Sequence, residues 1–442
     1  GHKRDGDAPG RQVMLTRPAA VGLALALLGA AWSGGDGATT TALEAPTSSA
    51  APAGGPGAAD DMAVVGGEAE VERPMAEGGI PSWAAAMVAG DDVIWVGGFG
   101  EQPAADTVYM IGSIAKAFDA TAVLQLHERG LLDLDADVSD YLPFRLRHPE
   151  HPDIPITIRM LLTHTSGMAH DLPAALWWDN DVSMLAWMEA HLGLDVSDYP
   201  FTDGLPPVGD YLEYFLAPGA EQGSDAWTAP PGTRLTYSNT AYTLILRYVI
   251  EQVSGQPFPA YMAENVFAPL GMTDSGYEAA DFRDEQLAIP HTRFEDGDRA
   301  LPPTGLAASG PLRTTARDLA IFLAAHMNEG SLGDTRLLVP EAIDTMHARH
   351  VALSGYDSMH DRLVGNGMGW WLWGDGQSGH GGGIPGFLGE MVMQETDAGT
   401  VGMVLMINIG CSLRCDRDII EAHFVPIRDR LLDEAAKTLV TP

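Results

Sequence analysis

Apolar and polar positions along the chain place strands near its two ends and helices between them. Apolar runs at Ser82–Ala89 and Val93–Gly98, separated by Gly90-Asp91-Asp92, predict a β-hairpin. A helical period follows from Ser113 to about Arg129, and Gly130 ends it. From about residue 80, the chain therefore starts with paired strands and continues into a helix.

The middle and the end of the chain complete this order. Helical periods recur between 155 and 270, including Tyr242–Val253, and again at 316–328. Strand patterns return at Met368–Trp373, at about 386–394 and at 401–409, and an amphipathic helix spans about 417–436. Strands at both ends with helices between them predict an α/β (α+β) fold, in which helices flank one antiparallel sheet built from both termini.

These patterns predict one catalytic domain at 61–442, with the sheet from about 75–115 and 300–442 and an inserted, mostly helical part from about 116–299. Before it, Arg17 and the apolar run Ala19–Trp32 have the length and flanking charge of a secretory signal. Residues 33–60 have the Ser/Thr/Ala/Gly/Pro-rich composition of a flexible linker. We therefore expect export to the periplasm or the extracellular space, with membrane attachment only if the signal segment stays uncleaved.

Composition narrows the possible partners. Hydrophobic residues make up 45% of the 442 residues and charged residues 19%, which is enough apolar material for a sizeable core. The formal net charge of −35 argues against binding to nucleic acid or to an anionic membrane surface. Lysine occurs only as Lys3, Lys116 and Lys437, which fits either a salt-adapted surface or GC-rich coding.

Neither the cysteines nor the paired histidines predict a metal or cofactor site. Cys411 and Cys415 supply only two of the four ligands of a usual structural zinc site, and they form either a local disulfide or two free thiols. Two histidine pairs lack an apparent third ligand and are interpreted as solvated side chains: His148 with His151, and His347 with His350. We expect no cofactor.

The sharpest candidate for catalysis is Ser113-Ile114-Ala115-Lys116, at the start of an apolar helix. Positions i and i+3 share one helix face, so the lysine amine can reach the serine hydroxyl. The helix N-terminus adds backbone N–H groups and the positive end of the dipole, both of which stabilise an oxyanion. For this motif taken alone, the alternative is a surface lysine beside an N-cap serine.

Two further motifs follow in the chain. Tyr237-Ser238-Asn239 precedes a helix, where the amide can orient the tyrosine; a core tyrosine beside an N-cap asparagine is the alternative. His380-Gly381-Gly382-Gly383 contains glycines that let a substrate approach the backbone. The string H-G-G-G also forms the oxyanion loop of lipases, but there it precedes a G-x-S-x-G turn, which this chain does not contain.

In this order, S-x-x-K, Y-x-N and H-x-G resemble the motifs of the serine β-lactamase and penicillin-recognising superfamily. The similar branch is the class C-like one, with family VIII carboxylesterases, D-aminopeptidases and DD-peptidases. The resemblance spans about residues 80–435 and includes five more segments that look like family segments: Leu131–Pro143, Ile156–Met168, Pro230–Asn239, Asn265–Ser275 and Ala308–Phe322.

The resemblance implies a role for each motif residue. Ser113 would be the nucleophile that forms an acyl-enzyme, and Lys116 would assist its deprotonation. Tyr237 would pass the proton to the leaving group and then activate water. Asn239 would hold Lys116 and the substrate, and the backbone N–H groups of Ser113 and Gly383 would form the oxyanion hole. Whether Lys116 or Tyr237 is the base stays open, as it does within the family.

One departure from the family bears on the substrate. Penicillin-type enzymes usually carry K-T-G where this chain has His380-Gly381-Gly382, so the ammonium and hydroxyl that hold a β-lactam carboxylate are missing. We therefore expect a serine hydrolase that acts on small esters, amides or peptides, as a carboxylesterase or a D-stereospecific peptidase. The alternatives are a β-lactamase, or a penicillin-binding module that acylates but scarcely turns over.

The segment 170–228 is rich in aromatic residues and is longer than a minimal class C-like scaffold needs. It forms either a lid or pocket wall for an apolar acyl group, or extra core in the helical part. His164 and Ser166, shortly before this segment, are interpreted as residues that hold a loop.

If the acidic surface is a salt adaptation, repulsion among the excess carboxylates destabilises the fold at low ionic strength. The melting temperature should then rise clearly between about 0.05 and 1 M NaCl, because the Debye length falls from above about 10 Å to about 3 Å. Thermal unfolding followed by circular dichroism at the two salt concentrations measures this. A flat response leaves codon composition as the explanation of the lysine deficit.

Overall fold

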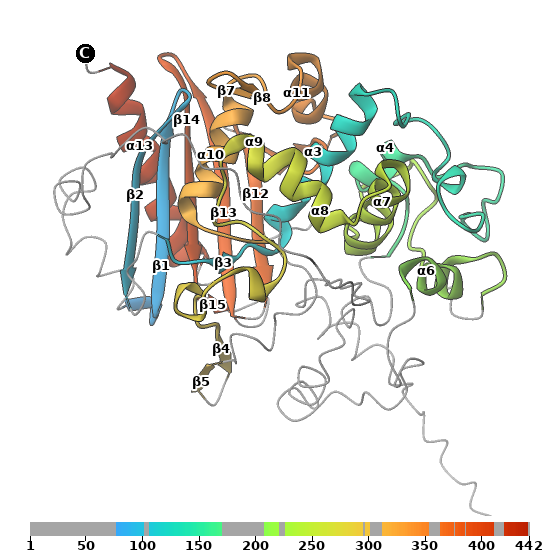
Figure 1. Cartoon of the computed structure of the whole chain (residues 1–442), viewed down its shortest axis with the longest axis horizontal. Helices are drawn as coiled ribbons and strands as arrows, with labels where there is room; N and C mark the ends of the chain where they lie inside the picture. Colours follow the sequence, from blue (N-terminus) through green and yellow to red (C-terminus); the bar gives the residue numbers. More distant parts are fainter. Residues whose placement is uncertain are drawn as a thin grey trace, which may run out of the picture.

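The computed structural model describes residues 77–100, 106–169, 207–220, 226–294, 297–300, 312–352, 363–374, 376–384, 386–410 and 420–440. Figure 1 shows a large sheet with a helical region beside it. The predicted signal segment and linker at 1–60, both Cys411 and Cys415, and most of the aromatic-rich segment 170–228 lie outside the described residues. What the sequence indicates about them stays a prediction.

One eight-stranded sheet joins strands from the two ends of the domain. In spatial order, its strands are β2 (Asp92–Gly100), β1 (Ser82–Ala89), β14 (Gly399–Ile407), β13 (Phe387–Thr396), β12 (Gln377–Ile384), β11 (Trp371–Trp373), β10 (Leu363–Asn366) and β9 (Val351–Ala352). Every neighbouring pair is antiparallel. Because β1 pairs with β14 along its length, from Trp83 opposite Ile407 to Ala89 opposite Val401, the predicted sheet built from both termini is confirmed.

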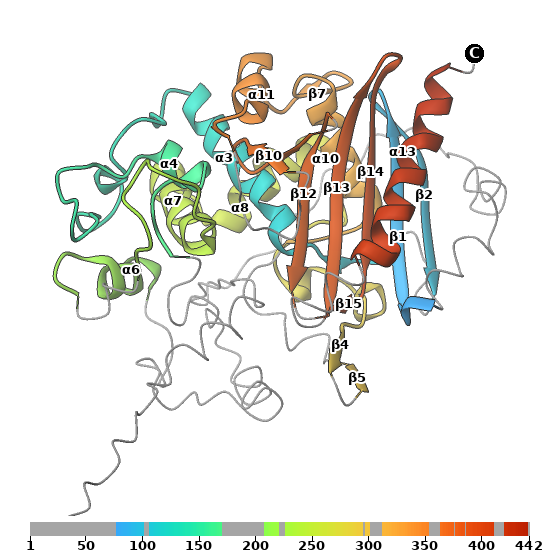
Figure 2. The same cartoon turned by 180° about the vertical axis from the view of Figure 1, so that it is seen from behind.

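The sheet separates two hydrophobic cores. α10 (Ala316–Met327) packs on one face, and α13 (Val425–Val440) runs along the other, as Figure 2 shows. All eight side chains of β1 are buried, with Ala84 in the core under α10 and its neighbour Trp83 in the core under α13. Burial on both faces explains why β1 is a continuous apolar run in the sequence instead of an alternating one.

The helical region begins with α3 (Ala115–Glu128), which packs against α7 (Arg247–Ser254). The helix predicted at Tyr242–Val253 begins earlier, as a π-helix at η4 (Thr240–Leu246) that continues into α7. The remaining α-helices are α4 (Ile158–Leu162), α6 (Val208–Leu216), α8 (Phe258–Met262), α9 (Ala268–Leu270) and α11 (Pro340–His347). Short 3₁₀ helices form η2 (Gly112–Ile114), η3 (Val138–Asp140), η6 (Ala279–Asp281) and η7 (Asp284–Gln286), and two further π-helices form η5 (Ala263–Phe267) and η8 (Ile420–Phe424).

Three small sheets have no counterpart among the predicted elements. Their strands are two to four residues long, too short for an alternating pattern to show in the sequence. β3 (Tyr109–Met110) pairs with β6 (Arg313–Thr314), β4 (His291–Phe294) lies between β5 (Gly297–Ala300) and β15 (Ile409–Gly410), and β7 (Ser331–Leu332) pairs with β8 (Thr335–Arg336). The first of them matters most, because β3 leads directly into the Ser113 turn.

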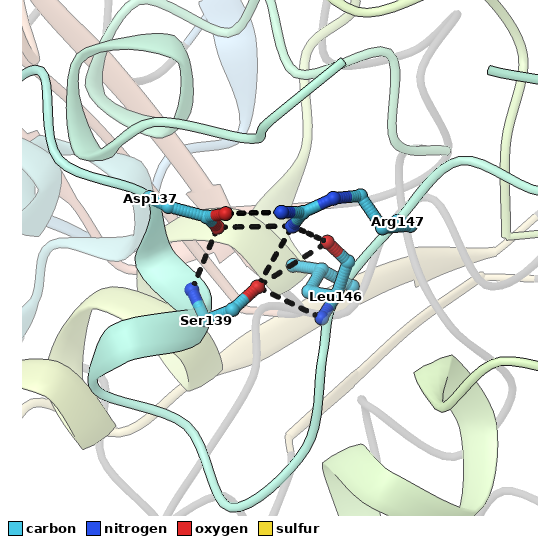
Figure 3. A network of polar contacts seen from close by, with 4 residues as sticks. All are labelled: Asp137, Ser139, Leu146 and Arg147. Carbon is cyan, nitrogen blue, oxygen red and sulfur yellow. Dashed lines mark hydrogen bonds and ion pairs between the residues drawn. The ribbon is translucent and has the colours of Figure 1, made fainter. Parts of the chain in front are cut away.

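An ion pair closes the loop around η3 (Figure 3). Asp137 Oδ1 accepts hydrogen bonds from the Ser139 N–H and from Arg147 Nη1, each at 3.0 Å, and Arg147 Nη2 binds the other carboxylate oxygen. Ser139 Oγ accepts from the Leu146 N–H at 3.0 Å. Burial opposes the charge, but the hydrogen bonds from Arg147 and Ser139 hold the pKa of Asp137 below its usual value.

The prediction that the histidine pairs are solvated is wrong for His148 and His347. His148 is 6% exposed, and its ring centre lies 4.8 Å from that of His151. His347 is partly buried, and its Nε2 lies 3.3 Å from Nδ1 of the buried His326. Within the described ranges, no group of three or more His, Cys, Asp or Glu is placed to hold a metal ion. None of the described helices is both long and apolar enough for a membrane span.

The buried histidines should make the fold sensitive to acid. Burial lowers the pKa of His347 to about 3, and burial together with His347 lowers the pKa of His326 well below 6.5. Each then takes up a proton at higher pH in the unfolded chain than in the folded one, so their contribution to stability is lost as the pH falls from about 6.5 toward 3.

The variant His347→Leu should therefore lose less stability than the wild type between pH 7 and pH 5. The expected difference is about 1–2 kcal/mol in the free energy of unfolding, because each pH unit below the unfolded pKa costs about 1.4 kcal/mol for one such group. Urea unfolding at the two pH values measures it. An equal loss in both proteins would contradict the assignment.

Candidate active site

Ser113 stands at a sharp turn between a short strand and α3. The Ile111 N–H donates to the Leu312 carbonyl at 3.1 Å, which ties the start of the turn to the chain before β6. Gly112 then takes a φ of +51°, a conformation that glycine adopts without strain. A Cβ at Gly112 would lie 3.0 Å from the Gly383 nitrogen, so glycine is required for space as well. The turn presents Ser113, partly exposed, at the start of the helix.

Lys116 lies at the beginning of α3 and is only 2% exposed. Its ammonium donates to Ser113 Oγ at 3.2 Å and to Asn239 Oδ1 at 2.7 Å. It also lies 4.9 Å from the centre of the Tyr237 ring and 5.9 Å from that of Tyr242, within the range of cation–π attraction. The structure thus brings the first two sequence motifs into direct contact, so the surface-lysine alternative for Lys116 is wrong.

The π-helix η4 begins directly after the Tyr237–Asn239 motif. Asn239 stands before its first turn, 7% exposed, and its side chain makes no capping bond to the helix. Its amide oxygen is directed at Lys116 instead. Ser238 Oγ accepts a hydrogen bond from the Ala241 N–H at 3.2 Å and so caps the turn. The N-cap alternative therefore does not hold for Asn239, and the wider π turn stands at a candidate site, as such turns often do.

His164 holds a loop, as the sequence analysis predicts, and it does so beside Tyr237. Its backbone takes a φ of +55°, and its Nδ1 accepts a hydrogen bond from the Ser238 N–H at 3.1 Å. Its ring centre lies 4.4 Å from that of Tyr237 and 4.9 Å from that of Tyr242. His164 therefore supports the tyrosine loop through both its backbone and its ring.

Tyr242 is a site residue that the sequence analysis missed. Its hydroxyl donates to the Leu162 carbonyl, and burial raises its pKa well above the usual value of 10. The phenol therefore stays neutral and adds a ring near the Lys116 ammonium. A tyrosine three residues after Asn239 in an apolar helix carries no sequence signal that separates it from an ordinary core residue.

The glycines of β12 bring its backbone against the serine turn. β11 pairs only with the first residues of β12, and the rest of that edge, from His380 onward, lies against η2. A Cβ at Gly382 would stand 1.9 Å from the Ile111 carbonyl oxygen and 3.1 Å from the Ser113 nitrogen. Only glycine allows this approach, and it brings the backbone of Gly383 beside that of the serine turn.

His380 and Gly381 are the residues that the resemblance aligns with the family's lysine and threonine. His380 is 2% exposed, and its Nδ1 lies 2.6 Å from the Gly381 carbonyl oxygen, a geometry in which the nitrogen donates. The nearest atoms to a Cβ added at Gly381 would be 3.8 and 4.0 Å away, so a side chain would fit there. The missing hydroxyl is a property of this sequence and not a steric necessity.

Trp371 completes a cluster of rings around Tyr237, and the sequence analysis missed it too. Its ring centre lies 5.9 Å from that of Tyr237, 5.7 Å from that of His380 and 6.3 Å from that of His164. Trp371 is partly exposed, so it provides apolar surface next to the tyrosine. In the sequence it is one residue of a predicted strand, and only the pairing of β11 with β12 brings it to the site.

The geometry agrees with comparisons to known proteins. The Beta-lactamase family model matches residues 68–410. The chain belongs to the beta-lactamase family. It is 29% identical over 296 residues to penicillin-binding protein 4 of Amycolatopsis lactamdurans, covering 64% of this chain and 68% of that protein. It is 31% identical over 212 residues to esterase EstB of Burkholderia gladioli, covering 46% and 48%.

A solved structure extends the comparison. A D-stereospecific amidohydrolase from Streptomyces sp. has a TM-score of 0.60 and 25% identity, over 83% of this chain and 99% of that one. This chain spans about two thirds of penicillin-binding protein 4 and about half of EstB. The resemblance to the serine β-lactamase superfamily is thereby confirmed, and the family places this chain among the serine hydrolases.

If Ser113 is the nucleophile, Ser113→Ala should lower turnover by about five to six orders of magnitude, because the reacting oxygen is lost. Lys116→Ala and Tyr237→Phe should each cost at least about 10²–10⁴-fold, the usual contribution of acid–base help. Steady-state hydrolysis of p-nitrophenyl butyrate measures these losses.

A fluorophosphonate probe, located by mass spectrometry, gives an independent reading. Ser113→Ala should abolish labelling, whereas Ser254→Ala, at the end of α7, should leave both labelling and turnover unchanged. Labelling that persists on another serine in Ser113→Ala would refute the assignment.

Proposed function

We propose that this member of the beta-lactamase family hydrolyses small neutral esters or amides through an acyl-enzyme on Ser113, as a carboxylesterase or a D-stereospecific peptidase. The observation that supports this most is the position of the Lys116 ammonium. It donates to Ser113 Oγ and to Asn239 Oδ1 and lies 4.9 Å from the centre of the Tyr237 ring. Such contacts lower the barrier to removing the serine proton and favour attack by the oxygen.

In acylation, Ser113 Oγ attacks the carbonyl carbon of the substrate, and its proton leaves through Lys116 or Tyr237. The carbonyl electron pair moves to the oxygen, where the N–H groups of Ser113 and Gly383 are assigned to stabilise the charge. The bond to the leaving group then breaks. Tyr237 returns the proton to the departing alcohol or amine, which leaves the acyl group bound to Ser113.

Deacylation repeats these steps with water in place of the leaving group. We assign the removal of one water proton to Tyr237, with Lys116 beside it. Hydroxide adds to the acyl carbon, the ester bond to Ser113 breaks, and Ser113 regains its proton. A carboxylic acid leaves, and the enzyme returns to its starting state.

The binding side of the site supports a neutral substrate. Gly381 offers no hydroxyl to a substrate carboxylate, and His380 replaces the usual lysine cation with a ring whose Nδ1 is already engaged by the Gly381 carbonyl. Trp371 adds apolar surface beside Tyr237, the residue assigned to protonate the leaving group. A neutral, apolar group fits such a surface better than a carboxylate does. The similar proteins include an esterase and a D-stereospecific amidohydrolase.

A penicillin-binding module that acylates but scarcely turns over is the second candidate. Its support is the similarity to penicillin-binding protein 4. The two candidates differ only in deacylation. A burst of product followed by steady turnover indicates a hydrolase, whereas a burst alone indicates a binding module.

Specificity tests the proposal directly. At pH 8, kcat/KM for p-nitrophenyl butyrate should exceed that for nitrocefin by at least about one to two orders of magnitude. This ratio corresponds to about 1.4–2.7 kcal/mol, the contribution of one charge-assisted hydrogen bond to a carboxylate. If nitrocefin is the better substrate, β-lactamase becomes the leading function.

A pair of variants at one position supplies the control. Because a side chain fits at Gly381, Gly381→Thr should raise kcat/KM for nitrocefin several-fold by restoring the hydroxyl. Gly381→Val has nearly the same shape without the hydroxyl and should not. An equal gain in both variants would assign the effect to packing and not to carboxylate binding.

A further inference from the structure

A buried ion pair lies one helical turn beyond the catalytic lysine. Asp119 on α3 is 0% exposed, and Arg247, the first residue of α7, is 2% exposed. Arg247 Nε donates to the two carboxylate oxygens at 3.2 and 3.3 Å. The guanidinium also lies 4.7 Å from the Phe258 ring centre and 5.5 Å from that of Tyr277. The mechanism above uses neither member of the pair.

The Asp119 charge acts on Lys116. They stand three positions apart on α3, at i and i+3, which puts both on one face of the helix. Burial raises the pKa of the Asp119 carboxyl, and the charges of Arg247 and Lys116 oppose that rise. The attraction between Asp119 and Lys116 is mutual, so the carboxylate that gains from the ammonium also stabilises it.

Groups that contact the ammonium include a hydroxyl, an amide oxygen and two aromatic rings, those of Ser113, Asn239, Tyr237 and Tyr242. The rings of His164 and His380 lie beside Tyr237, with ring centres 4.4 and 6.5 Å from that of Tyr237. The Asp119 charge also acts on Tyr242, because burial first and the Asp119 charge second raise the pKa of the Tyr242 phenol. Asp119 thus adds a negative charge near the hydroxyl, the amide and the aromatic rings that contact Lys116.

The pair is not explained by a contribution to the stability of the fold. Taking two charges out of water costs about as much as their attraction returns, and apolar replacements of buried pairs are often as stable. The position of the pair provides an electrostatic use instead. It also joins α3, which carries Lys116, to α7, which directly continues the η4 turn that follows Asn239.

We propose that Asp119, held ionised by Arg247, is a positioning residue for Lys116. The carboxylate stabilises the protonated form of the lysine amine and keeps the amine between Ser113 Oγ and Asn239 Oδ1. The consequence for catalysis rests on the proposed function, whereas the effect on the amine itself does not.

The lysine content of the chain makes a direct measurement possible. Only Lys3, Lys116 and Lys437 are present, so protein labelled with nitrogen-15 lysine gives at most three side-chain amine signals by NMR. Lys3→Arg and Lys437→Arg assign the Lys116 signal by elimination. In Asp119→Asn, the titration midpoint of that signal should fall by about one pH unit, because one nearby opposite charge shifts a pKa by about that much or more. Asp119→Glu keeps the charge and should restore most of the shift.

The rate at which a fluorophosphonate labels Ser113 gives a second measurement. As the pH increases, the labelling rate rises where the coupled pair of Lys116 and Tyr237 loses a proton. In Asp119→Asn, the midpoint of this rise should move to lower pH by about one unit. The reading needs no ester substrate. A protein that is labelled but hydrolyses neither esters nor amides would therefore refute the proposed function and still test this proposal.

A matched variant separates the electrostatic role from a structural one. Asp318 on α10 is also a buried carboxylate, and it accepts from Ser275 Oγ at 2.9 Å. Asp318→Asn should lower the melting temperature without moving the Lys116 midpoint. If Asp119→Asn does not fold, Asp119→Asn/Arg247→Gln removes both charges and should still lower the midpoint, by less because a cation is lost too. An unchanged midpoint in a folded variant without the Asp119 charge, or an equal shift in Asp318→Asn, overturns the proposal.

Discussion

The buried ammonium of Lys116 is the constraint on which the rest of the site depends. Removing such a charge from water costs several kcal/mol unless acceptors and ring faces replace the lost water. Ser113 and Asn239 supply the acceptors, and Tyr237 and Tyr242 supply the rings. Because these groups come from the serine turn, the tyrosine loop and a π turn, the elements must keep one relative position for the charge to be tolerated. The same requirement holds the reacting groups together.

A second constraint is the close approach of two backbones. Gly112 and Gly382 each stand where a Cβ would meet the opposite chain, so glycine at both positions lets β12 lie against the serine turn. β12 is held in place along its whole length by β13, which in turn pairs with β14. A stabilised oxyanion needs two N–H groups aimed at one point, and a rigid sheet edge supplies such precision better than a loop does.

The positions at the candidate site differ in how tightly the fold constrains them. Lys116 is buried, whereas Ser113, Tyr237 and Trp371 are partly exposed and Gly381 has space for a side chain. Residues of the second kind can change without breaking the fold. The relatives and solved structures similar to this chain include an esterase, a penicillin-binding protein and a D-stereospecific amidohydrolase, as expected when one fold supports several activities.

The sequence by itself determined the long elements and the motif built on local geometry. β1, β13 and β14 follow from short apolar runs bounded by turn residues, α3 follows from a helical period, and Lys116 reaches Ser113 because i and i+3 share a helix face. Only the tertiary structure decided which distant side chains meet. It directed Asn239 to Lys116, brought Trp371 and His164 to Tyr237, buried histidines expected in solvent, and paired Asp119 with Arg247, which lie 128 positions apart in the chain. A local period reports which face of an element is buried, but not which element covers it, because that depends on how the whole chain packs.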